Sequence, residues 1–127
     1  MECAILLVCF CDGRAQHINK MEQLIIHGGA GSLEGKVVEA QEMHDSLCHI
    51  WEDSFVILQK GSAEEAVRHA IRMLEDDPIF NAGTGSKLQA DGEVRMSSAL
   101  MDGTNNRFSG VINVQNIRNP IEAAALL

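Results

Sequence analysis

Basic and aromatic residues are both scarce in this sequence. The 127 residues carry a formal net charge of −8, and they include no tyrosine and a single tryptophan, Trp51. Without a cluster of lysine or arginine, an acidic chain is poorly suited to bind nucleic acid or an anionic membrane surface. No apolar run approaches the roughly 18 residues that a membrane-spanning helix requires. We therefore expect no nucleic acid and no membrane as partners.

Evenly spaced cysteines are also absent. Three of the four cysteines fall within the first eleven residues, and the full set is Cys3, Cys9, Cys11 and Cys48. This spacing does not suit a disulfide framework, and it lacks the second pair of ligands that a zinc site needs. Free thiols in a reducing compartment are the simpler interpretation, which predicts a cytoplasmic protein.

The first twenty residues differ from the rest of the chain. Their short apolar run follows Glu2 rather than the positive charge that opens a signal peptide. Met21 then begins a compact strand-and-turn pattern, "MEQLIIHGGAG". A secretory leader is one interpretation of residues 1–20. We favour an upstream extension, with residues 21–127 as the part that folds.

Two helices are predicted in the first half of the chain. Between about residues 36 and 60, apolar side chains recur every three or four positions, as on one helix face: Ala40, Met43, Leu47, Trp51, Phe55 and Leu58. "SAEE" after Gly61 is a capping box that starts a second helix at Ser62, with Glu65 as its partner. That helix is expected to end before Pro78.

Strands are predicted on either side of this helical pair. A short buried strand is expected at 23–27. Asp91-Gly92 is a strong hairpin signal between residues 86–90 and 93–98. Another turn is expected at Asp102-Gly103, followed by a strand over 108–115.

A last helix is predicted at the end of the sequence. Asn119 is suited to the N-cap and Pro120 to the first helical position. In chain order the elements are one strand, two helices, three strands and a helix. Helices and strands that cluster in this way indicate separate layers of sheet and helix, which is an α+β fold rather than a doubly wound array.

The glycine-rich segment "HGGAG", residues 27–31, is a candidate binding element. Successive glycine amides after a strand can form a nest that holds an anion or an oxyanion. The spacing matches neither a phosphate-binding loop nor the dinucleotide fingerprint. A tight turn without a ligand explains the same glycines. The residues alone leave both interpretations open.

A second glycine-rich segment, "FNAGTGS", follows the second helix. Its Asn81 can either donate to a carbonyl group or close an Asx turn. Three acids precede it, Glu75, Asp76 and Asp77, and they lie at the negative end of a helix dipole, which is unfavourable. A hard cation bound to the helix-terminal carbonyl groups would relieve that penalty.

Three stretches together resemble the plant-type L-asparaginases, also called isoaspartyl peptidases. They are "LIIHGGAG", "LEDDPIFNAGTGSKLQADGEVRMSSALMDG" and "SGVINVQNIRNPIEAA", in that order. The resemblance runs from about Met21 to Leu127. It implies part of the αββα sandwich of the N-terminal nucleophile hydrolases. Such enzymes are made as a precursor that cuts itself before a threonine, which then becomes the nucleophile of a β subunit.

The resemblance also implies a substrate and an assembly. Family members hydrolyse the side-chain amide of asparagine or the isopeptide bond of β-aspartyl dipeptides. Each α subunit pairs with the β subunit cut from the same precursor, and two αβ units form a dimer. No organic cofactor is implied, whereas a structural sodium ion is.

Individual residues take their expected roles from the resemblance. The first glycine-rich segment would lie beside the nucleophile and assist precursor cleavage, and Asn81 would lie near the threonine. This active-site set is His27, Gly28, Gly29, Gly31 and Asn81. Sodium would be bound by main-chain carbonyl groups of Leu74, Glu75, Asp77, Phe80, Ala82 and Thr84.

The sequence departs from the family pattern most clearly in its threonines. Thr84 and Thr104 are its only threonines, and neither lies in the context of the nucleophile. We expect the nucleophile beyond Leu127, so that this chain is the N-terminal portion of an α subunit and inactive alone. Two alternatives remain open, a non-catalytic remnant or interaction fragment, and an anion-binding module formed by the glycine nest.

Overall fold

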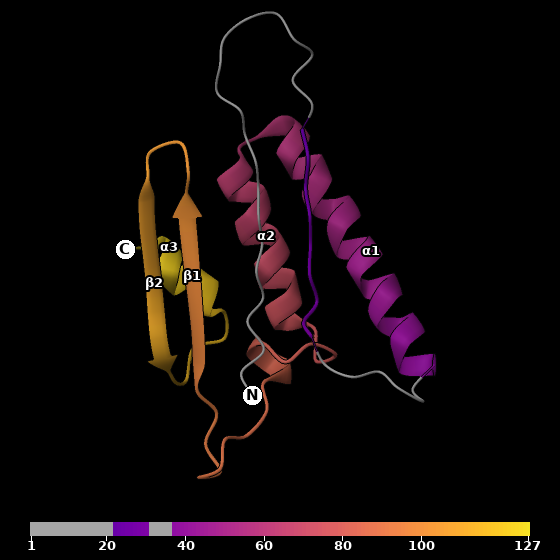
Figure 1. Cartoon of the computed structure of the whole chain (residues 1–127), viewed down its shortest axis with the longest axis vertical. Helices are drawn as coiled ribbons and strands as arrows, with labels where there is room; N and C mark the ends of the chain where they lie inside the picture. Colours follow the sequence, from indigo (N-terminus) through magenta and orange to yellow (C-terminus); the bar gives the residue numbers. More distant parts are fainter. Residues whose placement is uncertain (1–21, 31–36) are drawn as a thin grey trace, which may run out of the picture.

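The computed structural model describes residues 22–30 and 37–127. Two helices, α1 (Val37–Lys60) and α2 (Ala63–Asp76), pack side by side, and the extended segment 22–30 runs along them (Figure 1). A short 3₁₀ turn, η1 (Gly83–Gly85), leads to the hairpin of β1 (Met96–Asp102) and β2 (Arg107–Val114). Helix α3 (Pro120–Ala125) packs on both strands and contacts α2. The described residues are therefore α+β, as predicted.

Local sequence signals explain the two long helices. The Ser62 hydroxyl accepts the Glu65 N–H at 3.1 Å, and the Glu65 carboxylate accepts the Ser62 N–H at 2.8 Å, so the predicted capping box is confirmed. The apolar faces of α1 and α2 meet the loop that follows α2 in one core, formed by Ile50, Ala70, Leu74 and Phe80. Both helices end within two residues of the predicted positions.

The strand expected at 23–27 is not formed. Residues 22–30 are extended, but no ladder partner lies beside them in the described parts of the chain. A strand requires a hydrogen-bonded neighbour, whereas this segment packs on helices instead. Leu24 is buried against Leu58 and Ala66, and its carbonyl oxygen accepts the Trp51 Nε1–H at 2.9 Å.

The hairpin lies later in the chain than predicted. Asp91-Gly92 does form a turn, in which the Gln89 N–H donates to the Glu93 carbonyl group at 2.9 Å. Residues 86–90 form no strand, because Leu88 and its neighbours are exposed and pair with no strand among the described residues. The ladder instead joins β1 to β2 around the predicted turn at Asp102-Gly103, with Asp102 opposite Arg107. The strand expected at 108–115 corresponds to β2 and is confirmed.

Helix α3 begins where predicted but is capped in a different way. Asn119 occupies the N-cap and Pro120 the first turn. The Asn119 side chain makes no capping bond and donates instead to Asp76 Oδ1 at 3.1 Å. The Ile121 N–H at the start of α3 donates to Glu75 Oε1 at 3.1 Å. An acid at the end of α2 therefore caps α3.

Among the described residues, helix packing covers only one face of the hairpin. Helix α3 packs against both strands on that face (Figure 1). Large apolar side chains remain exposed on the hairpin, namely Met101, Phe108 and Ile112. In residues 22–30 and 37–127, no helix combines the length and the apolar character needed to cross a membrane.

Candidate functional site

The first glycine-rich segment contains a local hydrogen bond to its own histidine. The Gly29 N–H donates to His27 Nδ1 at 3.0 Å. Gly29 has φ of 114°, a conformation that residues with a Cβ rarely adopt. Because His27 already accepts this amide hydrogen, Gly29 is not available to the anion nest considered from the sequence. Gly31 lies outside the described residues.

The two glycine-rich segments meet in the structure. A Cβ atom added to Gly28 would lie 2.8 Å from Phe80 Cε1 and 3.2 Å from Leu47 Cδ1. Phe80 is only 1% exposed, so its ring has no room to move away. Gly28 thus allows residues 27–30 to pack directly on the segment that carries Asn81, which brings together two parts of the predicted active-site set.

The Asn81 side chain holds its own loop closed. Its Oδ1 accepts the Lys87 N–H at 3.0 Å, six residues further along the chain. This span is longer than that of the Asx turn considered from the sequence. The Nδ2 donor has no partner within the part of the chain that the structure describes. Asn81 therefore presents a half-buried amide donor that is fixed in position through its oxygen.

Glycines allow the loop after α2 to fold back on the helix end. A Cβ atom on Gly83 would overlap the Glu75 carbonyl oxygen, and one on Gly85 would overlap the carbonyl oxygen of Phe80. Gly83 also has φ of 47°. The loop therefore brings its backbone close to the last carbonyl groups of α2.

Most carbonyl groups predicted to bind sodium are free to accept a ligand. Within the described residues no hydrogen bond reaches four of them, those of Leu74, Glu75, Phe80 and Thr84. Pro78 has no N–H to continue the helical pattern, and the Ile79 N–H donates to Asp77 Oδ1 at 2.9 Å instead. The other two accept one bond each, that of Asp77 from Phe80 and that of Ala82 from Gly85. This donor set suits a hard cation.

The three acids beside this loop have separate partners. Asp77 Oδ2 accepts the Ser46 hydroxyl at 2.5 Å. The Asn119 amide, with help from the Arg118 guanidinium, holds the pKa of Asp76 below its usual range. Each of these carboxylates is therefore engaged by a neighbouring element rather than directed at a cation. No group of three or more His, Cys, Asp or Glu side chains in the described segments is arranged to hold a metal.

Glu75 is the buried member of this acidic stretch. Its residue is 4% exposed, and its Oε2 atom has no hydrogen-bond partner among the described residues. Burial raises its pKa to about 7, although the hydrogen bond from Ile121 opposes the shift. Sequence reasoning missed this role, because nothing local indicates that the side chain caps a helix 46 residues away.

Comparison of the sequence with known proteins identifies the family to which the chain belongs. A family model described as Asparaginase matches residues 20–127. The chain belongs to this family. The N-terminal nucleophile hydrolase fold of the family agrees with the α+β architecture, of which the described residues form only a part.

Its relatives carry more specific names. An isoaspartyl peptidase/L-asparaginase from Synechocystis sp. is 49% identical over 108 residues, which cover 83% of this chain and 32% of the relative. A protein of the same name from Nostoc sp. is 50% identical over 107 residues, covering 83% and 33%. A plant-type L-asparaginase from Pyrococcus horikoshii is 41% identical over 109 residues, covering 82% and 34%. The chain thus spans about a third of the length of the curated relatives it matches.

Proposed function

We propose that this chain supplies the N-terminal portion of the α subunit of a threonine-nucleophile hydrolase. The complete enzyme hydrolyses the side-chain amide of asparagine or the β-aspartyl peptide bond. The observation that carries this proposal is the contact of Gly28 with Phe80, which joins residues 27–30 to the Asn81 loop. The relatives named isoaspartyl peptidase/L-asparaginase support the same reaction class.

In this proposal the chain contributes positioning groups, and the nucleophile comes from a β subunit cut from the same precursor. The free Nδ2 donor of Asn81 is directed to a carbonyl oxygen at the reacting centre, where a fixed donor stabilises developing negative charge. The glycines leave room beside their backbone for the nucleophile's strand to approach. The rest of an αββα sandwich covers the hairpin face that α3 leaves open, and αβ units pair as dimers.

A sodium ion fits the loop after α2 in the same proposal. The six carbonyl groups named above would hold it, and its positive charge would offset the negative end of the α2 dipole. The ion would fix the loop and, through it, Asn81. The side chains of Asp76 and Asp77 would take no part, because both are already hydrogen-bonded to other elements.

A chimaera tests the proposed function. Residues 21–127 would replace the matching first third of the Synechocystis relative, and the purified product would be assayed for self-cleavage and for aspartate release from asparagine and from a β-aspartyl dipeptide. We expect both cleavage into two chains and aspartate release. The isolated 127-residue chain should release none above a heat-inactivated control, because it lacks a nucleophile. A folded chimaera that neither cuts itself nor releases aspartate would refute the proposal.

A variant of Asn81 tests its assigned role. Asn81→Asp keeps the Oδ1 acceptor for the Lys87 N–H but removes the Nδ2 donor. We expect aspartate release by the chimaera to fall by about 10²–10³-fold, the usual effect of losing one such donor. Gln59→Glu makes the same amide-to-acid change at an exposed site on α1 and should leave the rate unchanged. Equal rates for the two variants would remove Asn81 from the site.

The anion-binding alternative receives less support from the geometry. A nest needs free amide groups that converge on one point. The Gly29 N–H is already bonded to His27, which removes one of the amide groups that a nest would use. Inorganic phosphate added to the chain should therefore leave the amide resonances of Gly28 and Gly29 unshifted.

A further inference from the structure

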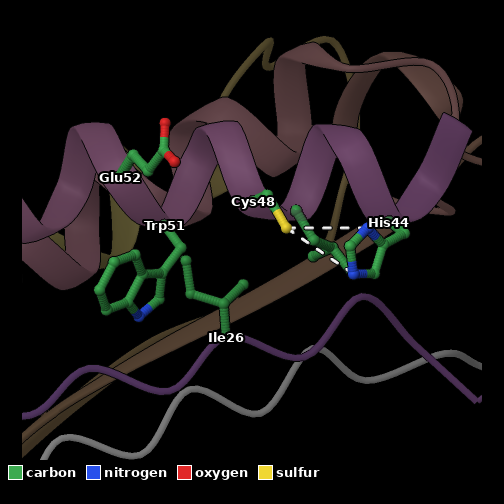
Figure 2. Close-up of a pocket in the computed structure, with 6 residues that line it drawn as sticks. Ile26, His44, Cys48, Trp51 and Glu52 are labelled. Carbon is green, nitrogen blue, oxygen red and sulfur yellow. Dashed lines mark hydrogen bonds between the residues drawn. The ribbon is translucent and has the colours of Figure 1, made fainter.

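A second cluster of reactive groups lies on α1. His44, Cys48 and Trp51 follow one another at spacings of four and three, which puts them on one face of the helix. With Ile26 and Leu47 they line an open cavity of about 300 Å³ between α1 and the segment 22–30. Figure 2 shows the Cys48 sulfur and the His44 ring next to each other on this face.

The thiol and the imidazole form a pair. Cys48 Sγ lies 3.7 Å from His44 Nδ1 and 3.8 Å from Nε2. A neutral imidazole has one basic nitrogen, and here that nitrogen is close to the sulfur in either tautomer. Asp45 Oδ1 lies 3.5 Å from His44 Nδ1. Cys48 is exposed, so a reagent can reach it.

The cavity walls favour an apolar reagent. Ile26, Leu47 and the Trp51 ring supply most of the lining, with Glu52 at one side. The indole is held in place, because its Nε1–H donates to the Leu24 carbonyl group and its ring stacks on Phe55 at 4.8 Å. An apolar substituent on a reagent would bury its surface against this fixed ring.

We propose that Cys48 is a covalent modification site for α,β-unsaturated carbonyl compounds with an apolar substituent, and that His44 is its base. The thiol proton moves to the basic nitrogen of His44, and the sulfur forms a bond to the β-carbon of the reagent. The electron pair of the C=C bond moves to the carbonyl group as an enolate. The imidazolium then returns a proton to the α-carbon, so that nothing is lost and no oxidant is needed.

The first experiment compares two histidines. The full chain, with Cys3, Cys9 and Cys11 each changed to serine, would be treated with N-phenylmaleimide, and the adduct would be followed by intact mass and by Trp51 fluorescence. His44→Gln should lower the second-order rate about tenfold, because the thiol loses its base. His49→Gln removes an exposed histidine of the same helix that faces Asp53, and it should not change the rate. Equal rates for the two variants would overturn the role of His44.

The second experiment tests the cavity. The rate with N-phenylmaleimide would be divided by the rate with a maleimide that carries a carboxylate. The same ratio would be measured for glutathione, and the two ratios would be compared. We expect the chain to prefer the phenyl reagent several-fold more than glutathione does, and Ile26→Ser to lower that preference. Trp51 emission should change in step with the mass. A preference equal to that of glutathione, or a mass change without a fluorescence change, would refute the assignment.

Discussion

Replacing Phe80 by alanine should cost a large share of the stability of the chain. The ring is 1% exposed and packs with Ile50, Ala70 and Leu74. Truncating a phenylalanine in such a core lowers the free energy of unfolding by about 3–5 kcal/mol. A domain of this size is stabilised by on the order of 10 kcal/mol, so the loss is roughly a third to a half of the total. The ring also contacts Gly28, so its removal leaves a gap between the two glycine-rich segments.

Phe108 provides the matched control. It is 73% exposed on the open face of the hairpin, so Phe108→Ala should change the free energy of unfolding by less than about 0.5 kcal/mol. Both variants would be unfolded in urea at low protein concentration and followed by helical circular dichroism and by Trp51 fluorescence. A loss for Phe80→Ala no larger than that for Phe108→Ala would show that the loop after α2 is not packed on the two helices.

Three further predictions concern Glu75, the sodium loop and the hairpin. Because burial raises the folded-state pKa of Glu75 from 4.5 to about 7, the folded chain keeps a proton that the unfolded chain loses between these pH values. In sodium-free buffer, the contribution of Glu75 to the free energy of unfolding should be complete below pH 4.5 and then fall by about 3 kcal/mol as the pH rises through 7. Glu75→Gln should abolish this fall. Parallel pH profiles of unfolding free energy for the wild type and Glu75→Gln would contradict the burial argument. Sodium binding, measured by ²³Na line broadening, should survive Asp77→Asn, because that change leaves the backbone unaltered. It should be lost in Gly83→Ala, because the added methyl group would overlap the Glu75 carbonyl oxygen. Loss of binding in Asp77→Asn would show instead that the Asp77 carboxylate is a ligand. The isolated chain should self-associate in sedimentation experiments through Met101, Phe108 and Ile112, and Ile112→Lys should reduce this; a wild-type monomer at all concentrations would oppose the prediction.

Elements with local signals were predicted well from the sequence. The capping box at Ser62 and Glu65 concerns two residues of the same turn, and it is formed as expected. The spacing of apolar residues likewise predicted α1 as an uninterrupted helix. In both cases the interactions that decide the structure lie within a few positions of one another, so the sequence alone contains the necessary information.

Strand pairing was predicted less well, because it depends on distant partners. Asp91-Gly92 has the composition of a hairpin turn, and a turn does form there. Its flanking residues lack the apolar surface that would hold two strands together, whereas Phe108–Val114 provides a partner for β1. Turn composition therefore predicted where the chain reverses, but not which reversal carries the sheet. The segment 23–27 shows the same effect, since its apolar residues pack on helices.

The candidate site depends even more on distant contacts. The sequence alone presented two glycine-rich segments with no reason to meet, and only the family resemblance placed them together. The structure supplies the physical reason, which is that Gly28 leaves room for the buried ring of Phe80. A contact of this kind depends on a missing side chain, and no periodicity or composition rule detects it.

The acidic stretch at the end of α2 shows how one short sequence can serve several elements at once. From the sequence, three adjacent acids at a helix end conflicted with the helix dipole. In the structure Glu75 caps α3, Asp76 bonds to Asn119 and Asp77 bonds to Ser46 on α1. Two of the carboxylates are thus compensated at the start of α3 and the third by α1, while the backbone of the same residues faces the loop. Because α3 in turn covers the hairpin, this single stretch connects the helical pair, the loop that carries Asn81 and the sheet.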